Sequence, residues 1–132
     1  MSPIRTILIL VAVVVASVLP LAVLAEDSAT PVGSWEVTTG ESRYDVIYCG
    51  KQPQICATLV WLRKDQRTTE NLALLHKYVV RHARPTGAQS WTGEVSLAGN
   101  TYRGTMTMLS EDLMVVRGCS GIFCKTFELA RR

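Results

Sequence analysis

Apolar and polar residues alternate with a period of two over most of the chain, and this alternation constrains the fold more than any other feature. Between positions 101 and 108, every second residue belongs to the set Tyr102, Gly104, Met106 and Met108, with polar residues between them. In an extended strand such residues share one face, whereas a helix needs apolar residues three or four positions apart. The pattern therefore predicts a β-strand with one buried face.

Similar alternation predicts further strands over residues 33–39, 44–49, 55–63, 76–83, 91–97, 113–119 and 122–129. Turn-forming residues separate many of these segments, at 50–53, 98–100 and 110–112. The sequence Pro85-Thr86-Gly87 is expected to end the strand that begins at His76, and one turn of helix or a loop is expected just before that strand, over 68–75. Short strands with regular turns and no long helical pattern predict an all-β fold, either an antiparallel barrel or a sandwich.

The first 25 residues have the composition of a secretory signal peptide. Arg5 precedes an apolar run over 7–19, Pro20 interrupts the apolar tract, and a short exit segment ends at Ala25. This order predicts a signal-peptide helix over residues 1–25 that is cleaved after Ala25. The alternative is an uncleaved anchor, because the apolar tract approaches the roughly 20 residues that span a bilayer. Cleavage is favoured, so we expect export to the periplasm or to the outside of the cell.

Cleavage would leave 107 residues, which is enough for one small domain. We expect a polar linker over 26–32 and the domain over 33–132. The mature chain carries a net charge near +2 and its basic residues are scattered, which argues against nucleic acid as a partner. No cysteine directly follows the predicted cleavage site, so nothing indicates a lipid anchor, and the mature form is not expected to span a membrane.

The chain has four cysteines, and an exported chain meets an oxidising compartment in which disulfides are the default. Three pairings are possible, of which the two local ones, Cys49–Cys56 and Cys119–Cys124, need only that each pair straddle a tight turn. The alternatives are a redox-active pair and a metal site. A zinc site is disfavoured because even the spacing of Cys119 and Cys124 is wider than the usual C-x2-4-C knuckle. We therefore expect two structural disulfides and no metal.

Residues that carry catalysis are sparse. His76 and His82 are six residues apart, a separation of roughly 20 Å along a continuous strand, so they are not expected to share a metal. No Gly-x-Ser-x-Gly motif, P-loop or dinucleotide-binding glycine motif is present. Asp45 and Glu94 each lie in the middle of a predicted strand and could point into a barrel, but a solvated carboxylate is the more common outcome. We expect a protein that is not an enzyme and that has no cofactor.

Several motifs in order along the chain resemble those of DUF2147, a family of exported bacterial proteins. They are Gly33-Ser34-Trp35, the stretch from Cys56 to Leu62, Trp91-Thr92-Gly93 with Gly99 to Tyr102, and the stretch from Arg117 to Cys124 followed by Arg131. The resemblance implies a small lipocalin-like β-barrel of about eight strands and brings no established enzymatic activity. The chain departs from the family pattern where a polar Tyr-Asp-Pro connection is absent after Gly93, and where Leu129-Ala130-Arg131 replaces a closing Trp-x-Arg.

Trp35 and Arg131 lie on the first and last predicted strands, which become neighbours when a sheet closes on itself. A guanidinium group over an indole ring contributes about 0.5–2 kcal/mol of cation–π attraction. We therefore expect this pair to close the barrel. The alternatives are that Arg117 reaches the same ring, or that Trp35 is a core residue and Arg131 a solvated end.

The apolar face of the predicted strands is expected to converge on the barrel interior. The candidate lining residues are Val60, Leu62, Val95, Tyr102, Met106, Met108 and Phe127. Small eight-stranded barrels either hold one small ligand or are filled by their own side chains. The leading hypothesis is a cell-envelope protein that binds a fatty acid or another small hydrophobic or amphipathic molecule. The alternative is a filled-core structural or protein-interaction module.

Overall fold

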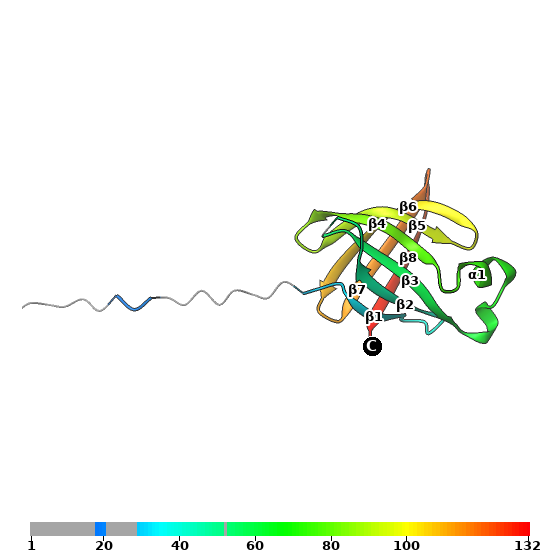
Figure 1. Cartoon of the computed structure of the whole chain (residues 1–132), viewed down its shortest axis with the longest axis horizontal. Coiled ribbons are helices and arrows are strands. Elements are labelled where there is room, and N and C mark those ends of the chain that lie inside the picture. The colour runs from blue at the N-terminus through cyan, green and yellow to red at the C-terminus, as the bar shows by residue number, and fades with distance from the viewer. Residues whose placement is uncertain (1–17, 21–28, 52) are drawn as a thin grey trace, which may run out of the picture.

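The computed structural model describes residues 18–20, 29–51 and 53–132. The strands between residues 33 and 131 form a closed antiparallel β-barrel (Figure 1). Each strand pairs with the next in the chain, and the last pairs with the first. The strands are β1 Gly33–Val37, β2 Ser42–Tyr48, β3 Ile55–Leu62, β4 Tyr78–Gly87, β5 Ser90–Leu97, β6 Asn100–Ser110, β7 Leu113–Ser120 and β8 Phe123–Arg131. The predicted all-β barrel of about eight strands is confirmed.

The predicted signal-peptide helix lies outside the described residues, apart from 18–20. Among the residues that are described, no helix is long and apolar enough to cross a membrane.

The predicted strand over 76–83 differs from β4 at both ends. His76 precedes the strand, and its φ of 62° places it in the left-handed region. The predicted strand stops at Ala83, before Pro85-Thr86-Gly87, whereas β4 includes these three residues and ends at Gly87, with Pro85 opposite Trp91 of β5. Pairing with β3 stops at Ala83, so the last part of β4 is an edge on that side. A proline is tolerated at an edge because its missing N–H leaves no ladder hydrogen bond unmade.

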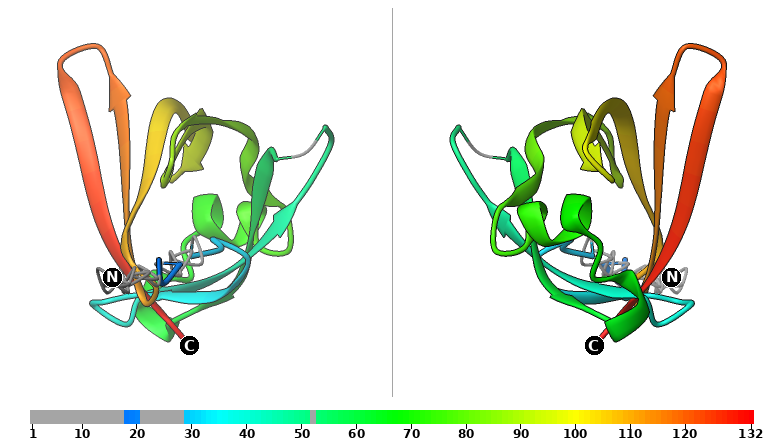
Figure 2. Two further views of the ribbon diagram at one scale, coloured as in Figure 1. Left: turned by 90° about the vertical axis from the view of Figure 1, so that its left-hand side faces the viewer. Right: turned by 90° about the vertical axis from the view of Figure 1, so that its right-hand side faces the viewer.

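A short helical segment follows β3 and covers one end of the barrel (Figure 2). It consists of a 3-10 turn at Lys64–Gln66 and helix α1 at Thr69–Leu74. Thr68 caps α1, because its hydroxyl accepts a hydrogen bond of 3.2 Å from the backbone N–H of Asn71. The helical option for residues 68–75 is therefore the one adopted, and Leu74 packs against the core.

The barrel closes through a short seam between β1 and β8, in which Trp35, Glu36 and Val37 pair with Arg131, Ala130 and Leu129. The two residues expected to close the barrel, Trp35 and Arg131, lie directly opposite each other. Trp35 is fully buried, and the guanidinium carbon of Arg131 lies 4.3 Å from the centre of an indole ring of Trp35. Arg131 also donates to the backbone oxygens of residues 30, 32 and 111, at 2.6, 2.8 and 2.8 Å. One side chain thus connects the segment before β1, the β6–β7 turn and β8.

Two glycines, Gly93 of β5 and Gly104 of β6, allow close packing against neighbouring strands. Gly93 and Gly104 lie opposite each other in register. A Cβ atom at Gly93 would lie 2.8 Å from the Cα of Ala83, and one at Gly104 would lie 2.3 Å from a methyl carbon of Val95. A larger residue at Gly93 would push against the backbone of Ala83, and a larger residue at Gly104 would push against the side chain of Val95 in the barrel interior.

Candidate ligand-binding site

The barrel encloses a small apolar cavity with a volume of about 40 Å³. Its walls come from all eight strands and are almost entirely hydrocarbon: Trp35, Val37, Tyr44, Val46, Ile55, Ala57, Val79, Val80, Val95, Leu97, Met106, Met114, Val116, Phe127 and Leu129. An engineered cavity of about 150 Å³ is large enough to bind benzene. The interior as it stands therefore has room for a few carbon atoms and not for a long acyl chain.

A second cavity of about 150 Å³ lies where α1 covers the end of the barrel, and we call it the mouth cavity. Its walls combine apolar and polar groups: Glu41, Ser42, Tyr44, Leu59, Leu62, Gln66, Asn71, Leu74, Val79, Ser96, Leu97, Ala98, Lys125 and Phe127. Four residues line both cavities, namely Tyr44, Val79, Leu97 and Phe127. The partition between the apolar interior and the polar mouth is thus only one layer of side chains thick.

The seven predicted lining residues lie in different parts of the structure, and only some of them line the interior cavity. Val95, Met106 and Phe127 line the interior cavity, and Leu62 lines the mouth cavity. Met108 is buried in the core outside both linings, since it lies at the far end of β6. Tyr102 is half-buried and is in neither lining, although it lies opposite the inward-facing Val95 in register. It borders a third hollow, which we call the outer groove because the exposed residues Arg81, Glu94 and Arg103 on the outer face line it.

Val60 lies outside both linings, so its placement in the barrel interior was wrong. The register between β2 and β3 shifts at this point, because Arg43 pairs with Trp61 while Tyr44 pairs with Leu59. Val60 is the extra residue of the resulting bulge and is half-buried. A bulge of one residue reverses the inward and outward faces of the strand beyond it.

Residues on β2, β3 and β7 that are not among the predicted lining residues also contribute to the cavity wall. Tyr44, Ala57, Met114 and Val116 all line the interior cavity. A signal for Met114 and Val116 was present, because they alternate with outward residues in a strand that had been predicted. Ala57 had no such signal, since a small side chain reveals little about the face on which it lies.

Of the four residues that line both cavities, Tyr44 is the one with a polar side-chain atom. Its hydroxyl accepts a hydrogen bond of 3.0 Å from the hydroxyl of Ser42, a residue that is itself buried. Burial raises the pKa of Tyr44 above 10.0, the hydrogen bond from Ser42 partly opposes this rise, and the nearby Glu41 carboxylate adds to it. The phenol therefore stays neutral at physiological pH and can both donate and accept a hydrogen bond.

The raised pKa of Tyr44 makes the stability of the fold dependent on pH in the alkaline range. The folded state holds the phenol proton more tightly than the unfolded state, so the stabilisation is complete below pH 10 and is lost as pH rises through the folded pKa. Urea unfolding at increasing pH is expected to show a fall in the free energy of unfolding above pH 10, and Tyr44→Phe is expected to reduce that fall. An identical alkaline loss in both proteins would contradict the assignment.

Lys125 places a positive charge at the mouth cavity. Its ammonium group lies 5.8 Å from the centre of the Tyr102 ring. Among the described residues, no carboxylate lies within 4.0 Å of that ammonium group. The one carboxylate in the mouth lining, Glu41, is 4.0 Å from the guanidinium of Arg63. Lys125 is therefore available to an anionic group that enters the mouth.

The candidate catalytic carboxylates do not point into the barrel. Asp45 and Glu94 are both exposed, and Asp45 accepts a hydrogen bond of 2.8 Å from the hydroxyl of Ser34. Their neighbours Val46 and Val95 are buried, so the two carboxylates lie on the outer face of the sheet.

Both predicted disulfides, Cys49–Cys56 and Cys119–Cys124, are confirmed. His82 packs beside the first of them, with its Nδ1 atom 4.0 Å from the sulfur of Cys49 and its backbone N–H donating to the sulfur of Cys56 at 3.4 Å. The possible ligand atoms of these three residues lie within 4.8 Å of one another. Because the two sulfurs are bonded to each other, they are not available as thiolate ligands in this state.

A search of curated proteins and a search of solved structures each found no match to the chain. A family model does match: it is described as an uncharacterized protein conserved in bacteria (DUF2147), and it covers residues 33–131.

Proposed function

The chain belongs to the DUF2147 family of bacterial proteins, and from that premise and the geometry of its barrel we propose that it is an exported protein that binds a small amphipathic molecule. The apolar part of the ligand enters the interior cavity, and its polar end stays in the mouth cavity beside Lys125. The observation that carries the proposal is that an almost entirely apolar cavity and a mixed polar cavity that contains Lys125 share a wall of four residues. Such a gradient from apolar to polar matches an amphiphile in shape and chemistry.

Export is supported by the N-terminal sequence and by the cysteines. Residues 1–25 have the order of charge, apolar run and short exit segment that a signal peptide needs. The two disulfides are consistent with folding in an oxidising compartment. We therefore place the protein in the periplasm or outside the cell, with the predicted signal peptide removed.

The small volume of the interior limits the ligand that it accepts. A cavity of about 40 Å³ suits a short or branched apolar group, so a longer acyl chain enters only if side chains move. Met106 and Met114 are the side chains best suited to such movement, because methionine is unbranched and adapts to irregular spaces. We therefore propose a short-chain or medium-chain ligand in preference to a long fatty acid.

The polar end of the ligand is bound at the mouth. Lys125 offers a charge to an anionic group such as a carboxylate, and the side chains of Ser42, Gln66 and Asn71 line the same cavity. Because Phe127 lines both cavities and is only half-buried, its rotation would open the interior to a ligand already bound at the mouth.

Titration with octanoate, followed by tryptophan fluorescence, tests the proposal because Trp35 lines the interior cavity. Saturable binding is expected, and Ala57→Leu is expected to abolish it by filling the cavity. Thr58→Leu on the same strand is the matched control, since Thr58 is in neither lining. Loss of binding in both variants, or in neither, would contradict the interior as the site.

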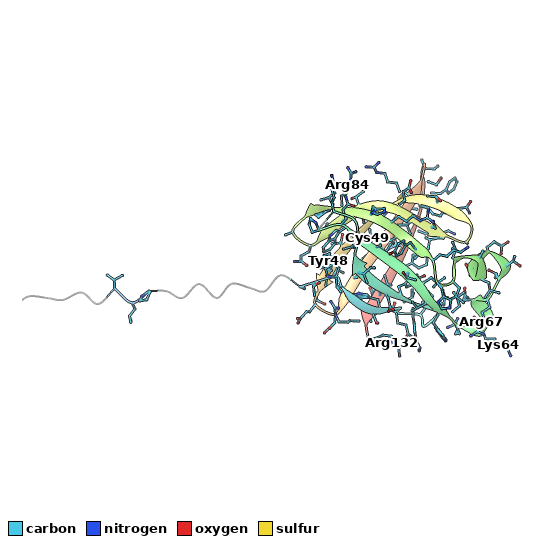
Figure 3. The ribbon with its side chains drawn as sticks, viewed as in Figure 1. Tyr48, Cys49, Lys64, Arg67, Arg84 and Arg132 are labelled. Atoms are coloured by element: carbon cyan, nitrogen blue, oxygen red, sulfur yellow. A yellow bond between two sulfur atoms is a disulfide. The ribbon has the colours of Figure 1, made fainter. Side chains whose placement is uncertain are left out.

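The contribution of Lys125, in the mouth cavity, to the affinity for octanoate is measured with the Lys125→Gln variant. The loss of one partly solvated ion pair is expected to weaken octanoate binding by about 2- to 5-fold. Lys64→Gln is the control, because Lys64 lies beside α1 at the periphery of the molecule and lines neither cavity (Figure 3). Equal affinities for the wild-type protein and Lys125→Gln would show that Lys125 does not contribute to ligand binding.

The outer groove favours a second candidate function. It has a volume of about 500 Å³ and lies across β4, β5 and β6, where Arg81, Arg84 and Arg103 surround a single acid, Glu94. Arg84 projects outward from the sheet (Figure 3). If the barrel works as a filled-core interaction module, this groove suits an acidic segment of a partner. Cross-linking in the cell envelope should then recover one partner that is lost in an Arg81→Glu, Arg84→Glu variant and kept in Ala57→Leu.

A further inference from the structure

The hairpin formed by β7 and β8 extends beyond the rest of the barrel (Figure 2). Its tip carries two exposed apolar side chains. Ile122 is 90% exposed and Phe123 is 76% exposed. They are adjacent, so the tip presents an apolar point of a kind that soluble proteins normally bury or use for binding. Phe127, which lines the interior, lies further along β8 on the same face as Phe123, since alternate residues share a face.

The tip is held in one conformation. Cys119 and Cys124 are opposite each other in register and are joined by a disulfide directly below the turn. Gly121 has a φ of 60°, which suits the first position of a tight two-residue hairpin turn. Ile122 and Phe123 are therefore presented to solvent by a rigid support, and little conformational entropy is lost when they bind.

Positive charges surround the hairpin just below the tip. Lys125 pairs with Gly118, Arg117 pairs with Thr126, and Arg103 of β6 pairs with Cys119. Arg103 and Arg117 are exposed. Glu94 faces Arg103 across the β5–β6 ladder, but no ion pair of 4.0 Å or less joins these two described residues. The hairpin thus has an apolar tip, Ile122 and Phe123, above a ring of three basic residues, Arg103, Arg117 and Lys125, which we call the cationic collar.

The distance between the apolar tip and the cationic collar is similar to the depth at which apolar groups of peripheral proteins enter a bilayer. Phe123 precedes Lys125 by two positions, which is about 7 Å along a strand at roughly 3.3 Å per residue. Apolar groups of peripheral proteins enter the boundary between headgroups and acyl chains by about 5–10 Å, and basic residues nearby are attracted to anionic headgroups. A specific protein interface usually buries about 800 Å² on each partner, which is far more than two side chains provide.

We propose that the β7–β8 hairpin docks the protein on an anionic lipid surface, with Ile122 and Phe123 in the interfacial layer and the three cations against the headgroups. This docking is peripheral and reversible. It does not depend on a ligand in the barrel, so it stands or falls separately from the proposed function. If both proposals hold, docking would bring the barrel and its mouth cavity to the membrane.

Co-sedimentation with vesicles tests the docking. The protein is incubated with vesicles of phosphatidylcholine alone and with vesicles that also contain phosphatidylglycerol. We expect binding to the anionic vesicles that weakens as salt concentration rises, and a loss of at least about 10-fold in the double variant Ile122→Ser, Phe123→Ser. Arg103→Gln with Arg117→Gln is expected to reduce both the affinity and its salt dependence.

Leu109→Ser is the matched control. Leu109 is 60% exposed near the β6–β7 turn and is likewise apolar, but it lies far along the sheet from the β7–β8 tip. All variants carry the same N-terminus, so any binding through that segment is common to them, and unchanged thermal unfolding shows that each is folded. The proposal is overturned if the wild-type protein does not bind anionic vesicles, if the tip variant binds as well as the wild-type protein, or if Leu109→Ser loses as much binding as the tip variant.

Discussion

Replacing Trp35 by alanine is expected to lower the free energy of unfolding by about 3–5 kcal/mol, the usual cost of truncating a large buried aromatic side chain. Trp35 is fully buried on a strand that meets β8 through three residue pairs only. The indole N–H donates a hydrogen bond of 2.9 Å to the backbone oxygen of Pro31, and the guanidinium of Arg131 lies over the ring. The substitution thus removes apolar burial, a hydrogen bond and a cation–π contact at the seam that closes the barrel.

Urea unfolding of Trp35→Ala and Trp61→Ala measures this effect against a matched control. Trp61 is also stacked with an arginine, since the guanidinium carbon of Arg43 lies 4.2 Å from its ring centre, but Trp61 is only half-buried. We expect the loss at Trp61 to be less than half of that at Trp35. Similar losses at the two positions would contradict the view that closure of the barrel depends on Trp35.

Replacing both Cys49 and Cys56 by alanine is expected to cost about 3 kcal/mol. Closing a loop of this length contributes roughly 2.5 kcal/mol by restricting the unfolded chain. Cys56 is in addition fully buried, and its sulfur accepts the backbone N–H of His82, so the folded state loses packing and a hydrogen bond as well. The second disulfide closes a loop of similar length, but Cys124 is exposed near the tip of a hairpin.

The two disulfides are compared by unfolding the Cys49→Ala, Cys56→Ala variant beside the Cys119→Ala, Cys124→Ala variant. The entropic contribution is nearly the same for both, so a larger loss in the first variant measures what the burial of Cys56 adds. If the second variant lost more stability than the first, this explanation would be wrong.

Much of the fold could be predicted because period-two alternation reports which face of a strand is buried. Met106 and Met108 of β6 are buried as the pattern required, while Thr105, just before them, is exposed and Thr107, between them, is only half-buried. The local disulfides followed from chain spacing and compartment. The closing pair followed from position, since the first and last strands of a barrel must meet.

What the sequence could not reveal depends on pairing between distant segments. The bulge that places Val60 outside the interior arises from the register between β2 and β3, which no local pattern encodes. The extension of β4 through Pro85 depends on the end of its pairing with β3. The volume of the interior depends on how side chains from all eight strands fill it, and on the close approach that Gly93 and Gly104 allow.

The central claim, that the barrel holds a small amphipathic ligand, is tested most directly by mass spectrometry of the protein purified from an oxidising compartment. Spectra under native and denaturing conditions are compared for the wild-type protein and for Ala57→Leu. We expect an additional mass on the native wild-type protein that is lost on denaturation and is absent from Ala57→Leu, together with a polypeptide four hydrogens lighter than its reduced form. A native wild-type protein that carries no additional mass, and that gains none when octanoate is added, would contradict the claim.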